Sequence, residues 1–319
     1  MFDFLTLTLN PSLDLSAGTE TVVAGPKLRL DDPVVEPGGG GVNAARAAVA
    51  MGAQVRAIVA LGGSTGARFQ RLLVDSGVSV SVFDLDGETR QCLSVTETAT
   101  GQQFRFVLPG AHWALTQVQD LLNRLMDELR RTGGDGVLVL SGSQPPGVPA
   151  NFPQDLAQAL PQARLIVDTS GAALQQLVAN PRAGARPDVL RMDQFEAEGL
   201  AGRALPKVSD SQAFATELVA RNVALTVILA RGAEGSVLVS DGMRLHCRPP
   251  PVQVVSKTGA GDSFTGAFAL ALSRKEPLDQ ALRLGTAAAA AAVITPATAL
   301  CRAEDVQRLA PACAMLSLG

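Results

Sequence analysis

The sequence has no tyrosine, one tryptophan and only two histidines, His112 and His246, among its 319 residues. Its four cysteines are scattered and show no Cys-x-x-Cys spacing. So few potential ligands argue against a zinc site, and scattered cysteines are typical of reduced thiols in a cytoplasmic protein.

Long apolar runs and a basic leader are also missing. No run of about eighteen apolar residues lacks charge or proline, and the alanine-rich stretch 286–294 is too short to span a bilayer. The first residues carry no basic group, so we expect no signal peptide. The net charge of −3 argues against a general nucleic-acid binder. These absences predict a protein with neither a membrane nor a nucleic-acid partner.

What the chain does have is a regular alternation of short apolar strands and helices, with 47% hydrophobic residues. Strands are expected at Phe4–Leu9 and Val55–Leu61, and a helix at Leu115–Arg131. The alternation predicts an α/β fold with a mostly parallel central sheet and helices on both faces. Segments 12–36 and 88–108 indicate β-structure without helices, so we expect them to form a small separate sheet. No repeat or linker is evident, and residues 1–319 are expected to form a single domain.

Polar residues follow three of the expected strands. They are Asn10-Pro11, Ser141-Gly142-Ser143 and Asp168-Thr169-Ser170. In an open parallel sheet, ligands bind at the carboxyl ends of the strands. We therefore expect the site at this edge.

The stretch from Lys257 to Phe268 is the most informative in the chain. A β-rich run, Pro251–Val255, leads to Gly259-Ala260-Gly261-Asp262 and then to an apolar helix. Backbone N–H groups of a glycine loop at a helix N-terminus form a cradle for a phosphoryl group. Asp262 beside such a cradle could take a proton from an attacking hydroxyl. The alternative is a glycine-rich turn whose aspartate caps the helix.

A second glycine loop, Gly38–Gly41, opens another expected helix and is followed by Asn43, whose amide can bind hydroxyl groups. The alternative is a flexible connector. Asp14 stands in the first β segment and could hold a sugar hydroxyl or be only a turn residue. The same two β segments carry basic residues that could meet over a pocket and bind a phosphate, or be solvated surface charges: Lys27, Arg29, Arg90 and Arg105.

Taken together, these motifs resemble the ribokinase-like (pfkB) carbohydrate kinase family. Asp14, Gly38–Gly41 with Asn43, and Gly259–Asp262 carry the resemblance, in the family's order. It spans essentially the whole chain and is strongest to the pfkB-type 6-phosphofructokinase branch. Phrases typical of that branch are Thr6–Asp14, Lys27-Leu28-Arg29, Thr89-Arg90-Gln91, Arg105-Phe106-Val107 and Ser141–Gly147.

The resemblance implies a ribokinase-like fold with a β-sheet lid and an ATP-dependent transfer of phosphate to fructose 6-phosphate at its 1-hydroxyl. Tagatose-6-phosphate kinase and 1-phosphofructokinase stay open as alternatives, as does a non-catalytic sugar-phosphate sensor. Mg²⁺ is expected with ATP, a role for K⁺ is left open, and a homodimer through the lid is expected.

The resemblance also assigns site residues. Asp262 matches the catalytic base, and the N–H groups of Gly259, Ala260 and Gly261 match the anion hole. The matched substrate contacts are Asp14, Gly39, Gly40, Asn43 and Ser141, with Lys27, Arg90 and Arg105 on the substrate's phosphate. The matched nucleotide positions are Arg191, Asp193, Arg231, Gly232, Gly235 and Lys257, and Glu196 matches a carboxylate that organises Mg²⁺ through water.

Three positions depart from the family pattern. Arg191-Met192-Asp193 stands where Lys-Pro-Asn is common, Ala230 replaces a hydroxyl residue, and Lys257 replaces a small hydroxyl residue. A carboxylate at Asp193 would repel nucleotide phosphates or recruit Mg²⁺. Our hypothesis is that Lys257 partly compensates for Asp193 and Ala230 in binding ATP.

Overall fold

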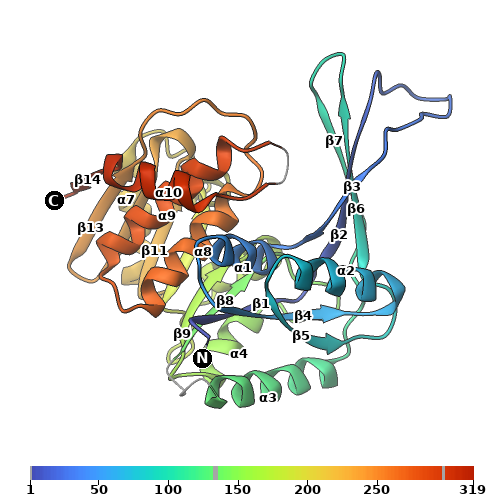
Figure 1. The fold of residues 1–319 in the computed structure, drawn as a ribbon. Coiled ribbons are helices and arrows are strands. Elements are labelled where there is room, and N and C mark those ends of the chain that lie inside the picture. The colour runs from blue at the N-terminus through green and yellow to red at the C-terminus, as the bar shows by residue number, and fades with distance from the viewer. Residues whose placement is uncertain (1, 132–135, 297–298) are drawn as a thin grey trace.

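The computed structural model describes residues 2–131, 136–296 and 299–319, which form a large sheet with helices on both faces and a small sheet that projects from it (Figure 1). In spatial order the strands of the large sheet are β14 (Ala314–Ser317), β13 (Met243–Arg248), β12 (Ser236–Ser240), β11 (Thr226–Ala230), β10 (Val189–Asp193), β9 (Arg164–Asp168), β8 (Val137–Ser141), β1 (Phe4–Thr8), β4 (Val55–Leu61) and β5 (Ser79–Asp84). From β11 to β5 all neighbours are parallel, whereas β12, β13 and β14 are antiparallel. The expected fold class is confirmed.

Each face of the large sheet has its own apolar core. Successive side chains of a strand point to opposite faces. Val137 and Val139 of β8 accordingly lie in one core, and Leu138 and Leu140 in the other. The first core is covered by α1 (Gly40–Ala50), α2 (Gly63–Asp75), α8 (Ala260–Ser273), α9 (Leu278–Val293) and α10 (Ala303–Leu309). The second is covered by α3 (Leu115–Arg131), α4 (Phe152–Ala159), α5 (Gly171–Ala179), α6 (Gln194–Ala201) and α7 (Val208–Ala220). Two short 3₁₀ turns, η1 (Gly232–Glu234) and η2 (Ala310–Ala312), complete the described elements.

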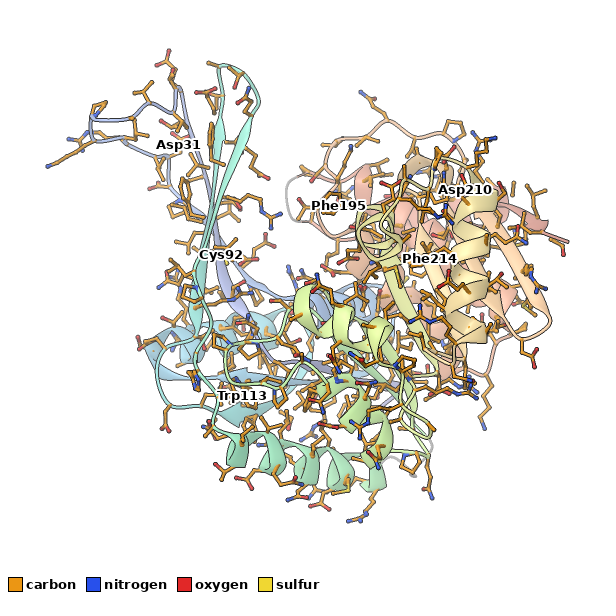
Figure 2. All side chains as sticks on the ribbon, turned by 180° about the vertical axis from the view of Figure 1, so that it is seen from behind. Asp31, Cys92, Trp113, Phe195, Asp210 and Phe214 are labelled. Atoms are coloured by element: carbon orange, nitrogen blue, oxygen red, sulfur yellow. The ribbon has the colours of Figure 1, made fainter. Side chains whose placement is uncertain are left out.

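The small sheet, which we call the lid, has the strand order β3 (Val34–Gly38), β2 (Ser12–Thr19), β6 (Arg90–Glu97) and β7 (Gln103–Val107). It rises from the carboxyl edge of the large sheet, as Figures 1 and 2 show from opposite sides. Both segments that lacked a helical pattern, 12–36 and 88–108, contribute to it. The expectation of a separate small sheet is therefore confirmed.

The three polar strand ends meet at the carboxyl edge of the large sheet, as expected. Asn10 Nδ2 donates to Ser143 Oγ at 3.2 Å, and Thr169 Oγ1 donates to the Gly142 carbonyl at 2.9 Å. These contacts join the loops after β1, β8 and β9. They form the floor from which the lid rises.

The sequence interpretation was wrong for two segments near the C-terminal half of the sheet. Pro251–Val255 forms no strand. It begins with the last of three consecutive prolines, 249–251, which lack the N–H that a sheet ladder needs. Strand β14 was missed, because four residues are too few for a periodicity signal; it pairs with β13. Within the described ranges no helix is long and apolar enough to cross a membrane.

Candidate active site

Helix α8 begins at Ala260, and its N-cap is Gly259, not Asp262. Gly259 has a φ of 76°, a conformation that glycine adopts without strain, and it has no side chain with which to cap the helix. Asp262 lies in the first turn, where it does not cap the helix. The interpretation of Asp262 as an ordinary helix cap is therefore wrong.

Asp262 is surrounded by four polar groups that come from four other elements. Asn43 Nδ2 in α1 donates to Asp262 Oδ2 at 2.9 Å. The pKa of Asp262 is raised from 3.8 to about 6: burial is the main cause and Asp168 and Asp14 also raise it, whereas the Asn43 hydrogen bond and Arg191 lower it. A carboxylate with a pKa in this range is ionised at neutral pH and basic enough to accept a hydroxyl proton.

Beneath the first turn of α8 lies an ion pair that the sequence did not reveal. Arg191 Nη1, at the carboxyl half of β10, contacts both carboxylate oxygens of Asp168 at 3.1 and 3.2 Å. Thr265 Oγ1 donates to Asp168 Oδ2 at 2.7 Å, and the Arg191 guanidinium lies over the Phe264 ring at 5.6 Å. A Cβ on Gly261 would lie 3.0 Å from both terminal nitrogens of Arg191. This glycine therefore lets a buried positive charge lie against the cradle.

The loop Gly38–Gly41 is a close-packed element, so the alternative of a flexible connector is wrong. A Cβ on Gly40 would lie 2.3 Å from Ser141 Oγ, and one on Gly41 would lie 2.8 Å from the Leu7 carbonyl oxygen. Gly39 has a φ of 121°, and a Cβ there would meet Thr8. The glycines therefore allow the start of α1 to sit directly on the ends of β1 and β8. Ser141 is buried beneath Gly40.

Asp14 is held at the base of the lid, on the face that looks toward Asp262. Ser12 Oγ donates to Asp14 Oδ1 at 2.6 Å. Burial raises the pKa of Asp14, while Ser12 and the charges of Arg90 and Arg105 lower it. The structure thus brings Asp14, Arg90 and Arg105 together, in front of Asn43 and Asp262.

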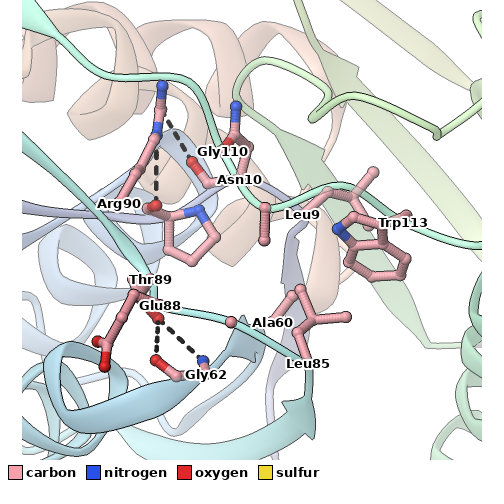
Figure 3. A pocket seen from close by; sticks show the side chains of 13 residues that line it. Leu9, Asn10, Ala60, Gly62, Leu85, Glu88, Thr89, Arg90, Gly110 and Trp113 are labelled. Carbon is pink, nitrogen blue, oxygen red and sulfur yellow. Dashed lines mark hydrogen bonds between the residues drawn. The ribbon is translucent and has the colours of Figure 1, made fainter.

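Arg90 is fixed by backbone oxygens. Its Nη2 donates to the Asn10 carbonyl at 2.9 Å, its Nε to the Pro11 carbonyl at 3.4 Å and its Nη1 to the Leu108 carbonyl at 3.3 Å. Figure 3 shows the first two of these bonds beside the pocket that Trp113 also lines. A preoriented guanidinium loses little entropy when it binds an anion.

Lys27 lies far from Arg90. It is exposed in the segment 20–33 between β2 and β3, at the end of the lid away from the large sheet (Figure 1). Arg90 pairs with Ser12 at the near end of β2, and the eight residues from Ser12 to Thr19 span about 23 Å. Within one chain, Lys27 is therefore not brought to Arg90.

In the nucleotide half, Asp193 and Glu196 cap α6. Asp193 Oδ1 accepts from the Glu196 N–H at 2.8 Å, and Glu196 Oε2 accepts from the Asp193 N–H at 2.9 Å. Aspartate caps a helix as well as asparagine does, which accounts for Asp193 locally. Burial raises the pKa of Glu196, and the nearby charges of Asp193 and Asp168 raise it further. Phe195 between them is 85% exposed and lies on the side facing the lid (Figure 2).

Arg231 does not fit a direct phosphate contact. Its side chain is 1% exposed, and it donates to the carbonyls of Leu205 and Pro206 at 2.9 Å each and pairs with Glu234 at 2.6 Å. It therefore anchors the turn that Gly232 and Gly235 form with φ angles of 58° and 89°. Lys257 is exposed, in the loop before Gly259.

A lidded site with a glycine loop at a helix N-terminus, a buried carboxylate and adjacent arginines is typical of a kinase for small polyhydroxylated substrates. The model of the pfkB family carbohydrate kinases matches residues 11–305. The chain belongs to this family and is a phosphotransferase with a sugar alcohol as acceptor.

Two relatives and two solved structures illustrate the likeness. The chain is 37% identical to the ATP-dependent 6-phosphofructokinase isozyme 2 of Escherichia coli K12, over 97% of this chain and 98% of the relative. It is 32% identical to a 1-phosphofructokinase of Xanthomonas campestris, over 96% and 93%. Solved structures of phosphofructokinase-2 from Escherichia coli, one in complex with fructose-6-phosphate and one with potassium, are each 36% identical. They match with TM-scores of 0.86 and 0.88 and cover 98% of this chain and 99% of theirs.

Proposed function

We propose that this protein is an ATP-dependent 6-phosphofructokinase that phosphorylates fructose 6-phosphate at its 1-hydroxyl. The observation that carries the proposal is the grouping of Asp14, Arg90 and Arg105 in front of Asp262. A cation pair beside a hydroxyl-binding carboxylate suits an acceptor that already carries a phosphate. An unphosphorylated sugar or a nucleoside would leave these arginines without an anion.

The geometry divides the work of phosphoryl transfer among three groups. Asp14 and Asn43 hold hydroxyl groups of the sugar, and Asp262 takes the proton of the hydroxyl that attacks. The N–H groups at the start of α8 and the buried charge of Arg191 stabilise the negative charge of the transferring phosphoryl. Alignment and charge neutralisation are the main requirements of this reaction.

The residues present fit Mg²⁺ that arrives with ATP. Mg²⁺ prefers one or two carboxylates together with water and phosphate oxygens. The capping hydrogen bonds engage one oxygen each of Asp193 and Glu196, and the second oxygen of each carboxylate can bind water of a hydrated ion. Among the described residues no cluster of three or more His, Cys, Asp or Glu residues forms a cage for a metal. Mg²⁺ neutralises the phosphates of ATP, while Gly232, Gly235 and Lys257 lie where the nucleotide is proposed to bind. K⁺ activation is also proposed, supported by the potassium complex of the relative.

A homodimer through the lid is part of the proposal. The face of the lid that points away from Asp262 is apolar: it carries Leu15, Leu93, Val95, Phe104 and Phe106 at alternate positions. Phe106 is 54% exposed in the single chain. A partly exposed apolar sheet face of this kind is typical of an interface, and a second copy presents a matching face. The cysteines are free thiols, which agrees with the cytoplasmic location we propose.

A coupled assay of ADP release tests the acceptor. Fructose 6-phosphate should give the highest kcat/KM in a panel with tagatose 6-phosphate, fructose 1-phosphate, fructose and ribose. A higher value for another sugar phosphate would move the proposal to that substrate. Specific binding of a sugar phosphate without turnover would favour the sensor.

A further inference from the structure

Arg46 in α1 links the lid to the asparagine that contacts the catalytic base. It lies one helical turn after Asn43, so both side chains share one face of α1. Its Nη1 donates to Asn43 Oδ1 at 3.4 Å and to the Pro37 carbonyl at 3.3 Å. Its Nη2 forms an ion pair with Glu36 Oε1 at 2.9 Å. Glu36 and Pro37 belong to lid strand β3.

The contact on Oδ1 decides which way the Asn43 amide points. An asparagine amide has a donor end and an acceptor end, and the two ends have nearly the same shape. A guanidinium only donates, so Arg46 favours the orientation that turns Oδ1 toward itself and Nδ2 toward Asp262. In the opposite orientation, an amide oxygen would face the carboxylate of Asp262, and the hydrogen bond between them would be lost.

The anchor of Arg46, Glu36, lies beside Asp14, the proposed sugar contact. Glu36 pairs in register with Asp14 across β3 and β2. Arg46 and Glu36 are both largely buried, with 17% and 23% of their side chains exposed. The ion pair between Arg46 and Glu36 is short and partly shielded from water. A change in the position of β3 would therefore move Arg46 and, through it, the Asn43 amide.

We propose that Arg46 is a positioning residue that orients the Asn43 amide toward Asp262 and connects this amide to lid strand β3. The inference rests on the proposed role of Asp262 as the base and adds to it a connection with the lid. Arg46 acts through Asn43 and is not assigned a contact with substrate.

The groups around Asp262 determine how its pKa should change when Arg46 no longer orients Asn43. Asp14 from β2, Asp168 from β9 and Arg191 from β10 face Asp262 in addition to Asn43. Of the interactions that lower the pKa of Asp262, the hydrogen bond from Asn43 is the largest. Losing the fixed amide orientation should therefore raise this pKa and move the base out of its ionised form near neutral pH.

The test measures the titration of Asp262 directly, by NMR of protein with ¹³C-labelled aspartate, with the signal assigned by its loss in Asp262→Asn. In Arg46→Met the Asp262 titration should move upward by about one pH unit. Glu36→Gln keeps the shape of the side chain but weakens the ion pair, and it should give a smaller shift in the same direction. Arg46→Lys keeps a donor and should recover part of the shift.

The control is Arg308→Met, which removes an ion pair with Asp305 in α10; neither residue is among the groups that shift the pKa of Asp262, so its titration should be unchanged. In turnover, Arg46→Met should lose more kcat at pH 6.5 than at pH 8.5, with little change in KM for ATP. Unchanged Asp262 titration in folded Arg46→Met, or in Glu36→Gln should the first variant not fold, would overturn the proposal. If Arg46→Met shows the NMR shift but the unmodified protein turns over no sugar phosphate, the positioning role of Arg46 would be supported and the proposed reaction contradicted.

Discussion

Gly266 of helix α8 lies against the backbone of Ala44 in helix α1, so close that a Cβ on Gly266 would lie 2.3 Å from the Ala44 carbonyl oxygen. This approach of two helices is what brings Asn43 to Asp262, although 219 residues separate them in the chain.

Gly266→Ala should therefore damage both stability and catalysis. Because the obstacle is backbone, the helices must move apart, and overpacking of this kind costs about 1–3 kcal/mol. We expect a lower urea midpoint together with a lower kcat. Gly199→Ala in α6 is the matched control, since a Cβ there meets nothing within 4 Å, and it should be neutral or stabilising. Equal effects of the two substitutions would contradict the role of the contact.

Asp262→Asn should lower kcat by about 10²–10⁴-fold, with little change in KM for ATP. The amide keeps the shape of the side chain but cannot take the proton. Steady-state kinetics with fructose 6-phosphate measures the effect, and Asp75→Asn at the exposed end of α2 is the control. Near-full kcat in Asp262→Asn would remove this residue from the role of base.

The same substitution should make the folded protein more stable at neutral pH. The pKa of Asp262 is raised to about 6 in the folded state from 3.8, so the unfolded chain loses this proton first. Folding stability is then lost as the pH rises from about 4 through about 6. Asp262→Asn lacks this loss, and above pH 7 it should be more stable by about 1–3 kcal/mol. Below pH 4 the unfolding curves of the two proteins should converge. A stability difference that does not depend on pH would refute the raised pKa.

Lys257→Thr should raise KM for ATP and leave KM for the sugar nearly unchanged, if Lys257 offsets the charge of Asp193. The comparison is Lys207→Thr at the start of α7, another exposed lysine, which lies at a position where threonine caps a helix well. An unchanged KM for ATP in Lys257→Thr would end the compensation hypothesis.

Phe106→Asp should convert the proposed dimer to a monomer, because a carboxylate on the apolar face of the lid cannot be buried without a partner. Size-exclusion chromatography with light scattering, with and without fructose 6-phosphate, measures the mass. Val74→Asp on the exposed side of α2 controls for added charge on the surface. A dimer that survives Phe106→Asp would place the interface elsewhere.

Local patterns predicted the elements best where they are long or buried on both sides. The helix expected at Leu115–Arg131 has these same bounds in the structure. The strand predicted at Pro251–Val255 does not form. Its apolar residues suggested a strand, but the prolines lack the N–H groups that a strand needs. The glycine loops were found from local chemistry, which needs only neighbouring residues.

Contacts between distant segments could not be predicted in this way. Asp168, Arg191 and Thr265 are ordinary residues on β9, β10 and α8, and only the packing of these elements makes them one network. Arg231 beside a glycine turn looks like a phosphate ligand in the sequence, yet two of the groups that hold it, the carbonyls of Leu205 and Pro206, lie more than twenty residues away. Lys27 was grouped with Arg90 and Arg105 because charge is visible in a sequence and the length of a strand between two charges is not.

Side chains along lid strand β6 alternate between the two faces of the lid, and this alternation limits which sequence changes the strand tolerates. Arg90, Cys92 and Ser94 point to the substrate side, and Leu93 and Val95 point to the opposite side. Deleting a single residue within the strand would exchange these two faces beyond the deletion. The proposed substrate recognition and the proposed self-association would then fail together, so we expect this strand to tolerate substitutions better than an insertion or a deletion.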